Sequence, residues 1–229
     1  PMGAEETFSG VIDLVEYKGV HYTDDLGTDP HIISIPESLA EDARMARERM
    51  IESLADYDEE IMELYLNGKD VPVATLKRAL RHNTIALKIV PVICGSAFKN
   101  KGVQKLLDAV VDYLPSPLDL PAVEGVNPDT MENVSRESSV MEPFTGLAFK
   151  ILVDPFVGRL VFTRVYSGTL AKGTTLYNPT NNSRERIGRI LRMHANKREE
   201  LDSATAGMII ALPGLKATRT GDTLCDEAH

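Results

Sequence analysis

The sequence lacks the features of a membrane or secreted protein. No segment approaches the ~18 consecutive apolar residues of a membrane-spanning helix. The opening PMGAEETFSG has neither the basic nor the apolar region of a signal peptide. The two cysteines, Cys94 and Cys225, lie far apart, and no Cys/His cluster has zinc-ligand spacing. These absences favour a cytoplasmic protein with no membrane partner, disulfide scaffold or metal site.

Catalytic signatures are missing as well. The phosphate-loop pattern GxxxxGK[ST] does not occur, because Gly68-Lys69-Asp70 lacks both the upstream glycine and the final hydroxyl residue. The five histidines are scattered, and no Ser/His/Asp arrangement stands out. Residue chemistry alone therefore identifies no catalytic residue and no complete active site.

What is present is an ordinary globular composition with an uneven charge. Of the 229 residues, 43% are hydrophobic and 26% are charged, which suits one large or two ordinary domains. Residues 1–116 carry 20 acidic and 12 basic side chains, a net charge of −8. Residues 117–143 carry 6 and 1, and residues 144–229 carry 8 and 12, giving −5 and +4. This asymmetry favours two partners of opposite charge.

The first half reads as short strands followed by helices. Residues 8–22 alternate loosely around a Lys-Gly pair and predict a hairpin, whereas residues 23–33 are polar and turn-rich. A helical pattern then runs to about Leu66, with Ser34 as its expected cap. Its apolar and acidic stripes stay in phase, which favours one helix of ~30 residues, although Asp56-Tyr57-Asp58 could break it. A further helix is predicted from Val73 to His82.

Residues 88–114 predict a strand, a loop and a helix. The β-branched run at 88–94 does not alternate, which is typical of a strand buried on both faces. The loop CGSAFKNKG follows at 94–102, and residues 103–114 have apolar side chains at helical spacing. Ligands of open α/β sheets lie at such strand ends, so this loop is a candidate binding site.

The second half predicts a different architecture. Residues 117–143 contain four prolines and many acids, as expected of a linker or a strap along a surface. From residue 144 to residue 229, short strands and turns follow at close spacing without a helical pattern, which favours a small β-barrel.

Four stretches carry a family resemblance. CGSAFKNKGVQKLLDAVVDYLPSPLDLP resembles the end of the GTPase domain of bacterial elongation factor G. PMGAEETFSGVIDLV resembles the start of the insertion subdomain within that GTPase domain, and GRLVFTRVYSGTL with RIGRILRMHANKREEL resembles the barrel that follows it. The implied fold class is α/β, a partial P-loop GTPase domain with an α+β insertion subdomain, followed by an all-β translation-factor barrel. The implied domains are residues 1–116 and 144–229, joined by the linker 117–143.

The resemblance implies roles for particular residues. Ser96, Ala97 and Phe98 would border the guanine of GTP or GDP, with a backbone N–H of the loop facing the base oxygen. The whole factor hydrolyses GTP with magnesium and moves transfer RNA and messenger RNA on the ribosome. Its phosphate loop, switch regions and NKxD motif have no counterpart here, so we expect this chain to be an internal fragment that binds no nucleotide and is inactive alone.

Two partners follow from the same resemblance. The acidic stripe would contact the carboxyl-terminal domain of the ribosomal stalk protein, with Glu52, Asp56 and Glu59 at the centre and Glu48 and Glu63 outside them. The barrel would rest on small-subunit ribosomal RNA. Its candidate RNA contacts are Arg184, Arg186, Lys197 and Arg198.

Alternatives stay open at this point. A paralogue for ribosome recycling or ribosomal protection shares much of the pattern, and a ribosome-binding module unrelated to GTP would also explain the acidic and basic halves. A strand at 88–94 without its neighbours would leave its edge and the apolar side of helix 103–114 exposed. We therefore also expect the chain to self-associate.

Overall fold

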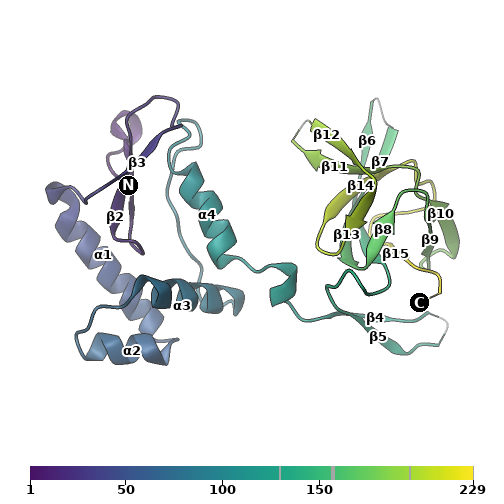
Figure 1. Ribbon diagram of the computed structural model, residues 1–229, viewed down its shortest axis with the longest axis horizontal. Coiled ribbons are helices and arrows are strands. Elements are labelled where there is room, and N and C mark those ends of the chain that lie inside the picture. Colours follow the sequence, from purple (N-terminus) through teal and green to yellow (C-terminus); the bar gives the residue numbers. More distant parts are fainter. Residues whose placement is uncertain (129, 156–157, 196, 229) are drawn as a thin grey trace. The chain divides into compact units, whose positions relative to one another are not determined.

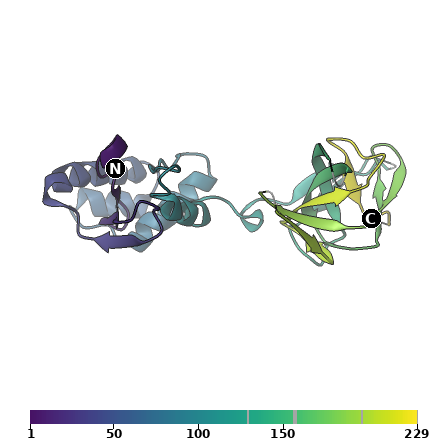
Figure 2. The same cartoon turned by 90° about the horizontal axis from the view of Figure 1, so that it is seen from above.

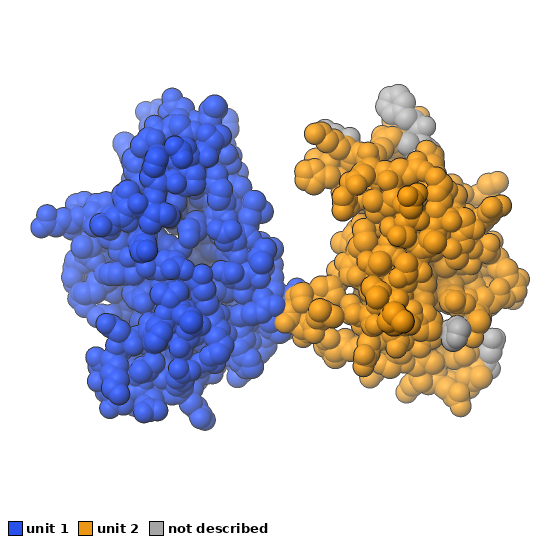
Figure 3. Space-filling view, viewed as in Figure 1, with its two compact units in different colours: residues 1–115 blue, residues 116–229 orange. Residues whose placement is uncertain are grey.

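The computed structural model describes residues 1–128, 130–155, 158–195 and 197–228. It divides into two compact units, residues 1–115 and 116–229, which Figure 3 colours separately. Residues 117–143, the predicted linker, fall within the second unit. Among the described residues, none of the helices combines the length and the apolar character that crossing a membrane requires.

The first unit, described throughout, packs helices beside a small antiparallel sheet (Figure 1). The sheet has the order β1-β2-β3, and its first two strands form the hairpin predicted within 8–22. The turn lies at residues 14–17, however, and the Lys18-Gly19 pair that was expected to form it lies in β2. The third strand lies in the stretch that was predicted to be turn-rich. The elements are η1 (Glu5–Thr7), β1 (Gly10–Asp13), β2 (Lys18–Tyr22), β3 (Pro30–Ile33), α1 (Glu37–Ala55), α2 (Glu59–Leu66), α3 (Val73–Ile85) and α4 (Val103–Tyr113).

The single long helix predicted up to Leu66 is wrong, because two helices form. The chain is extended at Asp58 (φ −143°), and the Asp58 carboxylate accepts a hydrogen bond of 3.1 Å from the Ile61 N–H. Asp58 is therefore the N-cap of α2, and aspartate is one of the residues preferred at that position. Ser34 is not a cap either, since α1 begins after Pro36 without a side-chain cap.

The break between α1 and α2 has a packing reason. Leu54, near the end of α1, and Ile61, in α2, are both buried in one apolar cluster with Leu76 and Ala79 of α3. A bend at 56–58 lets both helices present apolar side chains to α3. The sequence stripes are in phase with either arrangement, and tertiary packing selects the bent one.

The strand predicted at 88–94 does not form. In this fully described unit no strand lies beside this segment, so its backbone has no ladder to join, and a lone strand is not stable in water. Val90 and Val92 are 85% and 93% exposed. The helix predicted to follow is confirmed as α4, yet none of its residues is buried.

The second unit is a β-barrel, as predicted for residues 144–229 (Figures 1 and 2). Among the described residues, one sheet has the order β10-β9-β15-β6-β7-β14-β11-β12, and β13 pairs with β8. The strands are β6 (Thr145–Asp154), β7 (Gly158–Ser167), β8 (Thr169–Ala171), β9 (Thr175–Asn178), β10 (Ser183–Arg186), β11 (Ile190–His194), β12 (Lys197–Leu201), β13 (Ser203–Thr205), β14 (Ile209–Pro213) and β15 (Thr223–Cys225).

One apolar core lies inside these strands. Val161, Leu170, Ile190 and Leu212 are each fully buried within it. The strand residues alternate between this core and the surface, which is the pattern that a small barrel requires.

The residues predicted as a linker have some structure of their own. A short 3₁₀ turn, η2 (Pro117–Asp119), is followed by a two-stranded ribbon, β4 (Val123–Val126) and β5 (Asn133–Arg136). We call residues 117–143 the strap, because part of the segment lies against β7 of the barrel.

Candidate functional site

The loop at 94–102 forms a closed turn. The Ser96 N–H donates to the Lys101 carbonyl at 2.8 Å, and the Lys101 N–H donates to the Ser96 carbonyl at 3.0 Å. The Lys99 N–H donates to Ser96 Oγ at 3.3 Å. These bonds close the base of the turn and leave Ala97 and Phe98 at its tip.

Residues far away in sequence brace this loop. The Tyr22 hydroxyl accepts a hydrogen bond from the Gly102 N–H at 2.9 Å and donates to Gln104 Oε1 at 2.8 Å. The Gln104 amide donates in turn to the Gly27 carbonyl at 3.0 Å. The β1–β2–β3 region therefore braces the loop, whereas the sequence favours a strand at 88–94 in that role.

Gly102 and Gly27 make this contact possible. Gly102 has a φ of +88°, and a Cβ there would lie 3.1 Å from the Gly95 Cα atom. Gly27 has a φ of +61°, and a Cβ there would lie 2.5 Å from the Asn100 carbonyl oxygen. Both positions need the left-handed conformation and the close approach that only glycine accommodates easily.

The tip of the loop suits a flat ligand with an acceptor atom. Ala97 and Phe98 are exposed, Phe98 to 99%. Their backbone N–H groups donate no hydrogen bond within the described part of the chain. A free backbone donor beside a small side chain can bind an acceptor atom of a ligand.

The structure divides the predicted acidic stripe between two helices. Glu48, Glu52 and Asp56 follow one another at four-residue spacing along α1 and its C-cap, and Glu59 and Glu63 do so on α2. All five are exposed. We call them the acidic rows. Like charges at this spacing repel, so a basic partner would stabilise them.

Only one member of the acidic rows has an ion pair among the described residues. The Glu48 carboxylate lies 2.6 Å from Arg44 Nη1, and Arg44 also contacts Glu41. Hydrogen bonding to Glu41, together with the charge of Glu48, raises the pKa of Arg44. Glu52, Asp56, Glu59 and Glu63 have no cationic side chain within 4.0 Å in the described part of the chain.

Asp58, between the two rows, has a structural role that the sequence did not reveal. Its side chain is 8% exposed, and it lies 2.9 Å from Arg78 Nη1 of α3. Burial raises the pKa of this carboxyl, but the hydrogen bonds from Arg78 and the Ile61 N–H outweigh burial, and the net pKa is lowered. An acid just before a helical run is the signal that could have identified it.

The predicted RNA contacts of the barrel fall into two groups. Arg184 forms an ion pair with Glu227, and Arg198 lies 2.6 Å from Asp154. Arg186 and Lys197 are exposed, and neither has an acidic partner within 4.0 Å among the described residues. Two of the four are therefore already neutralised within the chain.

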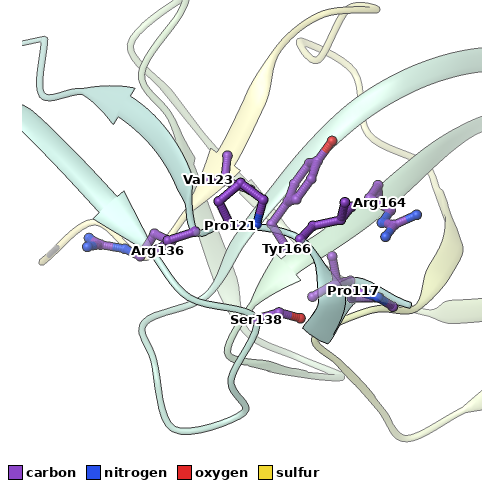
Figure 4. Close-up of a pocket in the computed structure, with 10 residues that line it drawn as sticks. Pro117, Pro121, Val123, Arg136, Ser138, Arg164 and Tyr166 are labelled. Carbon is purple, nitrogen blue, oxygen red and sulfur yellow. The ribbon is translucent and has the colours of Figure 1, made fainter. Parts of the chain in front are cut away.

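A pocket that the sequence did not predict lies between the strap and β7 (Figure 4). Its volume is about 360 Å³, and Pro117, Pro121, Val123 and Tyr166 form much of its lining. The Arg164 guanidinium lies 5.7 Å from the centre of the Tyr166 ring. The lining is mainly apolar, so the pocket offers packing surface and few groups for chemistry. In the described residues, no cluster of His, Cys, Asp or Glu could hold a metal ion.

Two comparisons with known proteins bear on these surfaces. Residues 143–227 match the family model of elongation factor G domain 2. The structure is also similar to the crystal structure of a protein from Thermus thermophilus, with a TM-score of 0.75 and 23% identity. That likeness shows a shared fold. It covers 99% of this chain and 31% of the other, so this chain spans about a third of the protein it matches. The family match therefore applies to the barrel, residues 143–227, and the structural likeness adds the fold of the chain.

Proposed function

We propose that this chain is a fragment of elongation factor G, the translational GTPase that moves transfer RNA and messenger RNA on the ribosome. The observation that carries the proposal is the match of residues 143–227 to domain 2 of that factor. The first unit supports it, because residues 94–102 form an exposed, braced loop directly before α4. Translation would place the whole protein in the cytoplasm.

The loop at 94–102 would be one wall of a guanine pocket. Ala97 and Phe98 offer backbone donors to the base oxygen, and Ser96 fixes the turn behind them. GTP or GDP with magnesium would bind the whole protein, since phosphate contacts supply most of the affinity in such sites. Alone, the chain should neither hydrolyse GTP nor bind GDP measurably. Micromolar affinity for GDP in calorimetry would contradict this.

The acidic rows would bind the carboxyl-terminal domain of the ribosomal stalk protein. Glu52, Asp56 and Glu59 would be central, because they are exposed and have no cationic partner among the described residues. Glu63 would lie outside them, and Glu48 would contribute less because Arg44 already neutralises it. The barrel would meanwhile rest on small-subunit ribosomal RNA.

The test measures binding of the stalk domain to this chain at low salt. Changing Glu52, Asp56 and Glu59 together to Lys should abolish measurable binding, because three attractive charges become repulsive. The matched control changes Asp25, Asp70 and Glu124 to Lys, which alters the net charge equally at exposed sites outside the rows. Binding that survives the first triple change, or is lost equally in the control, would reject this surface.

A second candidate function is a paralogue that recycles ribosomes or protects them from antibiotics. It is favoured by the same barrel match, since related factors share this domain. A ribosome-binding module with no link to GTP is a further alternative. The parent gene distinguishes the module from the other two: a GxxxxGK[ST] motif upstream of this sequence supports a GTPase, either the translocase or a paralogue, and its absence supports the module.

A further inference from the structure

A buried carboxylate of the barrel holds one surface loop by its backbone. Glu185 lies on β10, and the residue is 8% exposed. It accepts hydrogen bonds from the backbone N–H groups of Lys216, Ala217 and Thr218, at 2.5, 3.0 and 2.7 Å, and from the Thr218 hydroxyl at 2.6 Å. Four donors to one buried carboxylate fix the backbone of residues 216–218.

Other side chains hold the same loop by its carbonyl groups. Arg159 donates to the Lys216 carbonyl at 3.0 Å and also to the Thr218 carbonyl. Asn181 donates to the Ala217 carbonyl at 3.0 Å, and Asp222 accepts from the Arg219 N–H at 2.8 Å. The backbone is thus held from both sides, while the side chains of Lys216 and Arg219 remain exposed.

Like Arg186 and Lys197, the cations on this loop have no acidic partner among the described residues, whereas several other barrel cations do. Arg184, Arg192 and Lys172 each have an acidic partner at the surface, as Arg198 does. Within the described residues, Lys216 and Arg219 have no acidic group within 4.0 Å of their cationic nitrogens. The carboxylates of Glu185 and Asp222 are turned to the loop backbone, so the two cationic side chains are the groups presented to solvent.

We propose that the loop 216–219 is the barrel's contact with the phosphate backbone of RNA, through Lys216 and Arg219, with Glu185 as its positioning residue. The inference rests on the proposed function and names the residues of its RNA contact. Because the loop backbone is already held, binding would have to order only the two exposed side chains, which favours contact with a polyanion such as folded RNA. The loop replaces Arg184 and Arg198 as the expected contact, because binding through those two would first require breaking their ion pairs.

The test compares two double variants with equal charge loss. Lys216→Ala with Arg219→Ala removes the loop cations, and Arg184→Ala with Arg192→Ala removes two cations that are paired with acids. Binding of the full chain to a labelled RNA duplex and to purified small ribosomal subunits is measured across a salt series. The loop variant should bind the duplex about 10-fold more weakly, with a salt slope reduced by about 2, while the control stays within about twofold of wild type.

A third variant tests positioning. Glu185→Gln keeps the shape of the side chain but places an amide among four donors, so the loop should lose its fixed backbone. RNA binding should weaken while the salt slope stays as in wild type, because both cations remain. If Glu185 only stabilised the barrel, the melting temperature would fall and RNA affinity of the folded protein would not change, which would reject the positioning role.

The outcomes separate this inference from the proposed function. Small subunits that bind wild type and the loop variant equally would overturn the loop assignment and leave the proposed function standing. A loop-dependent affinity for duplex RNA, without any binding to small subunits, would support the loop and count against the proposed function. Binding to neither would reject both. If poly-glutamate displaced the labelled RNA duplex as effectively as unlabelled RNA does, the loop would prefer an acidic protein partner, and the RNA assignment would be overturned.

Discussion

The barrel and the region around α4 differ in how far their apolar side chains are buried. In the barrel, Leu170 and Leu212 are fully buried in a core made by strands of the same unit. On α4, Leu107 and Val111 are 60% and 76% exposed, although the apolar residues of this helix follow a clear helical spacing. The barrel completes its own core, whereas the apolar face of α4 has no cover within the first unit.

This difference indicates that the first unit has an apolar contact surface around α4, which the barrel does not need for its own core. Val90 and Val92, just before the loop, are exposed in the same way as the face of α4. Exposed apolar surface on this scale marks a contact surface. The barrel buries a complete core of its own, which agrees with a domain that matches a family model as a unit.

The largest expected effect separates a buried from an exposed leucine. Leu170→Ala should lower the free energy of unfolding of the barrel by about 3 kcal/mol, because it removes a fully buried side chain and leaves a cavity. Leu107→Ala, the same change on α4, should alter the stability of the first unit by less than about 0.5 kcal/mol. Both changes in the free energy of unfolding can be measured by urea unfolding, with hydrogen exchange reporting on each unit separately. Equal costs at the two sites would contradict the contrast.

The next prediction concerns association through α4. Wild-type chain should form dimers or larger species at high concentration, and Leu107→Glu with Val111→Glu should make it monomeric. The two positions are four residues apart, so both charges fall on one helix face. Light scattering measures the mass. Leu118→Glu, at an 81% exposed residue of the strap, is the control and should leave association unchanged. A monomeric wild type would show that this face does not drive association.

Local patterns in the sequence predicted most elements, and the errors share a cause. The barrel, the 8–22 hairpin and α4 follow from periodicity and turn residues, which are local properties. The 88–94 segment has the composition of a buried strand, but forming a strand requires a neighbour that composition cannot supply. The helix break at Asp58 was left open, because a pattern of 100° per residue fits one helix or two.

The candidate sites show the same difference between local sequence features, which could be predicted, and contacts between distant residues, which could not. The candidate residues Ser96 and Ala97 were identified from a short motif, and the acids on α1 and α2 from their spacing. The groups that hold them were not visible, since Tyr22 braces Gly102 from 80 residues away. Glu185 is one acid among arginines on β10, and nothing local distinguishes it from a surface residue until the loop at 216–218 is seen to surround it.

A smaller effect is expected at the cap between the acidic rows. Asp58→Ala should lower the free energy of unfolding of the first unit by about 2 kcal/mol, because α2 loses its cap and Arg78 loses one of its two carboxylate partners, keeping Glu60. Asp58→Asn keeps an acceptor for the Ile61 N–H and loses only the charge, so it should cost less. Urea unfolding near neutral pH compares the two. An equal loss in both variants would show that the charge, and not the cap, matters.

The same residue predicts a pH dependence. The pKa of Asp58 in the folded state lies below its ordinary value of 3.8, so the unfolded chain takes up the proton first as the pH falls. The stabilisation is therefore present above about pH 4 and is lost as the pH falls through the folded-state pKa. Asp58→Asn should remove this part of the acid sensitivity, and unfolding curves at several acidic pH values would measure it.

The smallest effect is expected where the β1–β2–β3 region contacts the loop at 94–102. Tyr22→Phe removes the hydroxyl that accepts from the Gly102 N–H, at little change in shape. Because that N–H lies in a buried contact, the loss should cost about 1 kcal/mol and speed exchange of the Gly102 amide roughly five-fold. Tyr65→Phe, at a tyrosine of α2 that is 40% exposed, should leave the Gly102 amide unchanged. Unaltered exchange in Tyr22→Phe would mean that the closing bonds between Ser96 and Lys101 suffice to hold the loop, and that the β1–β2–β3 region is dispensable for its shape.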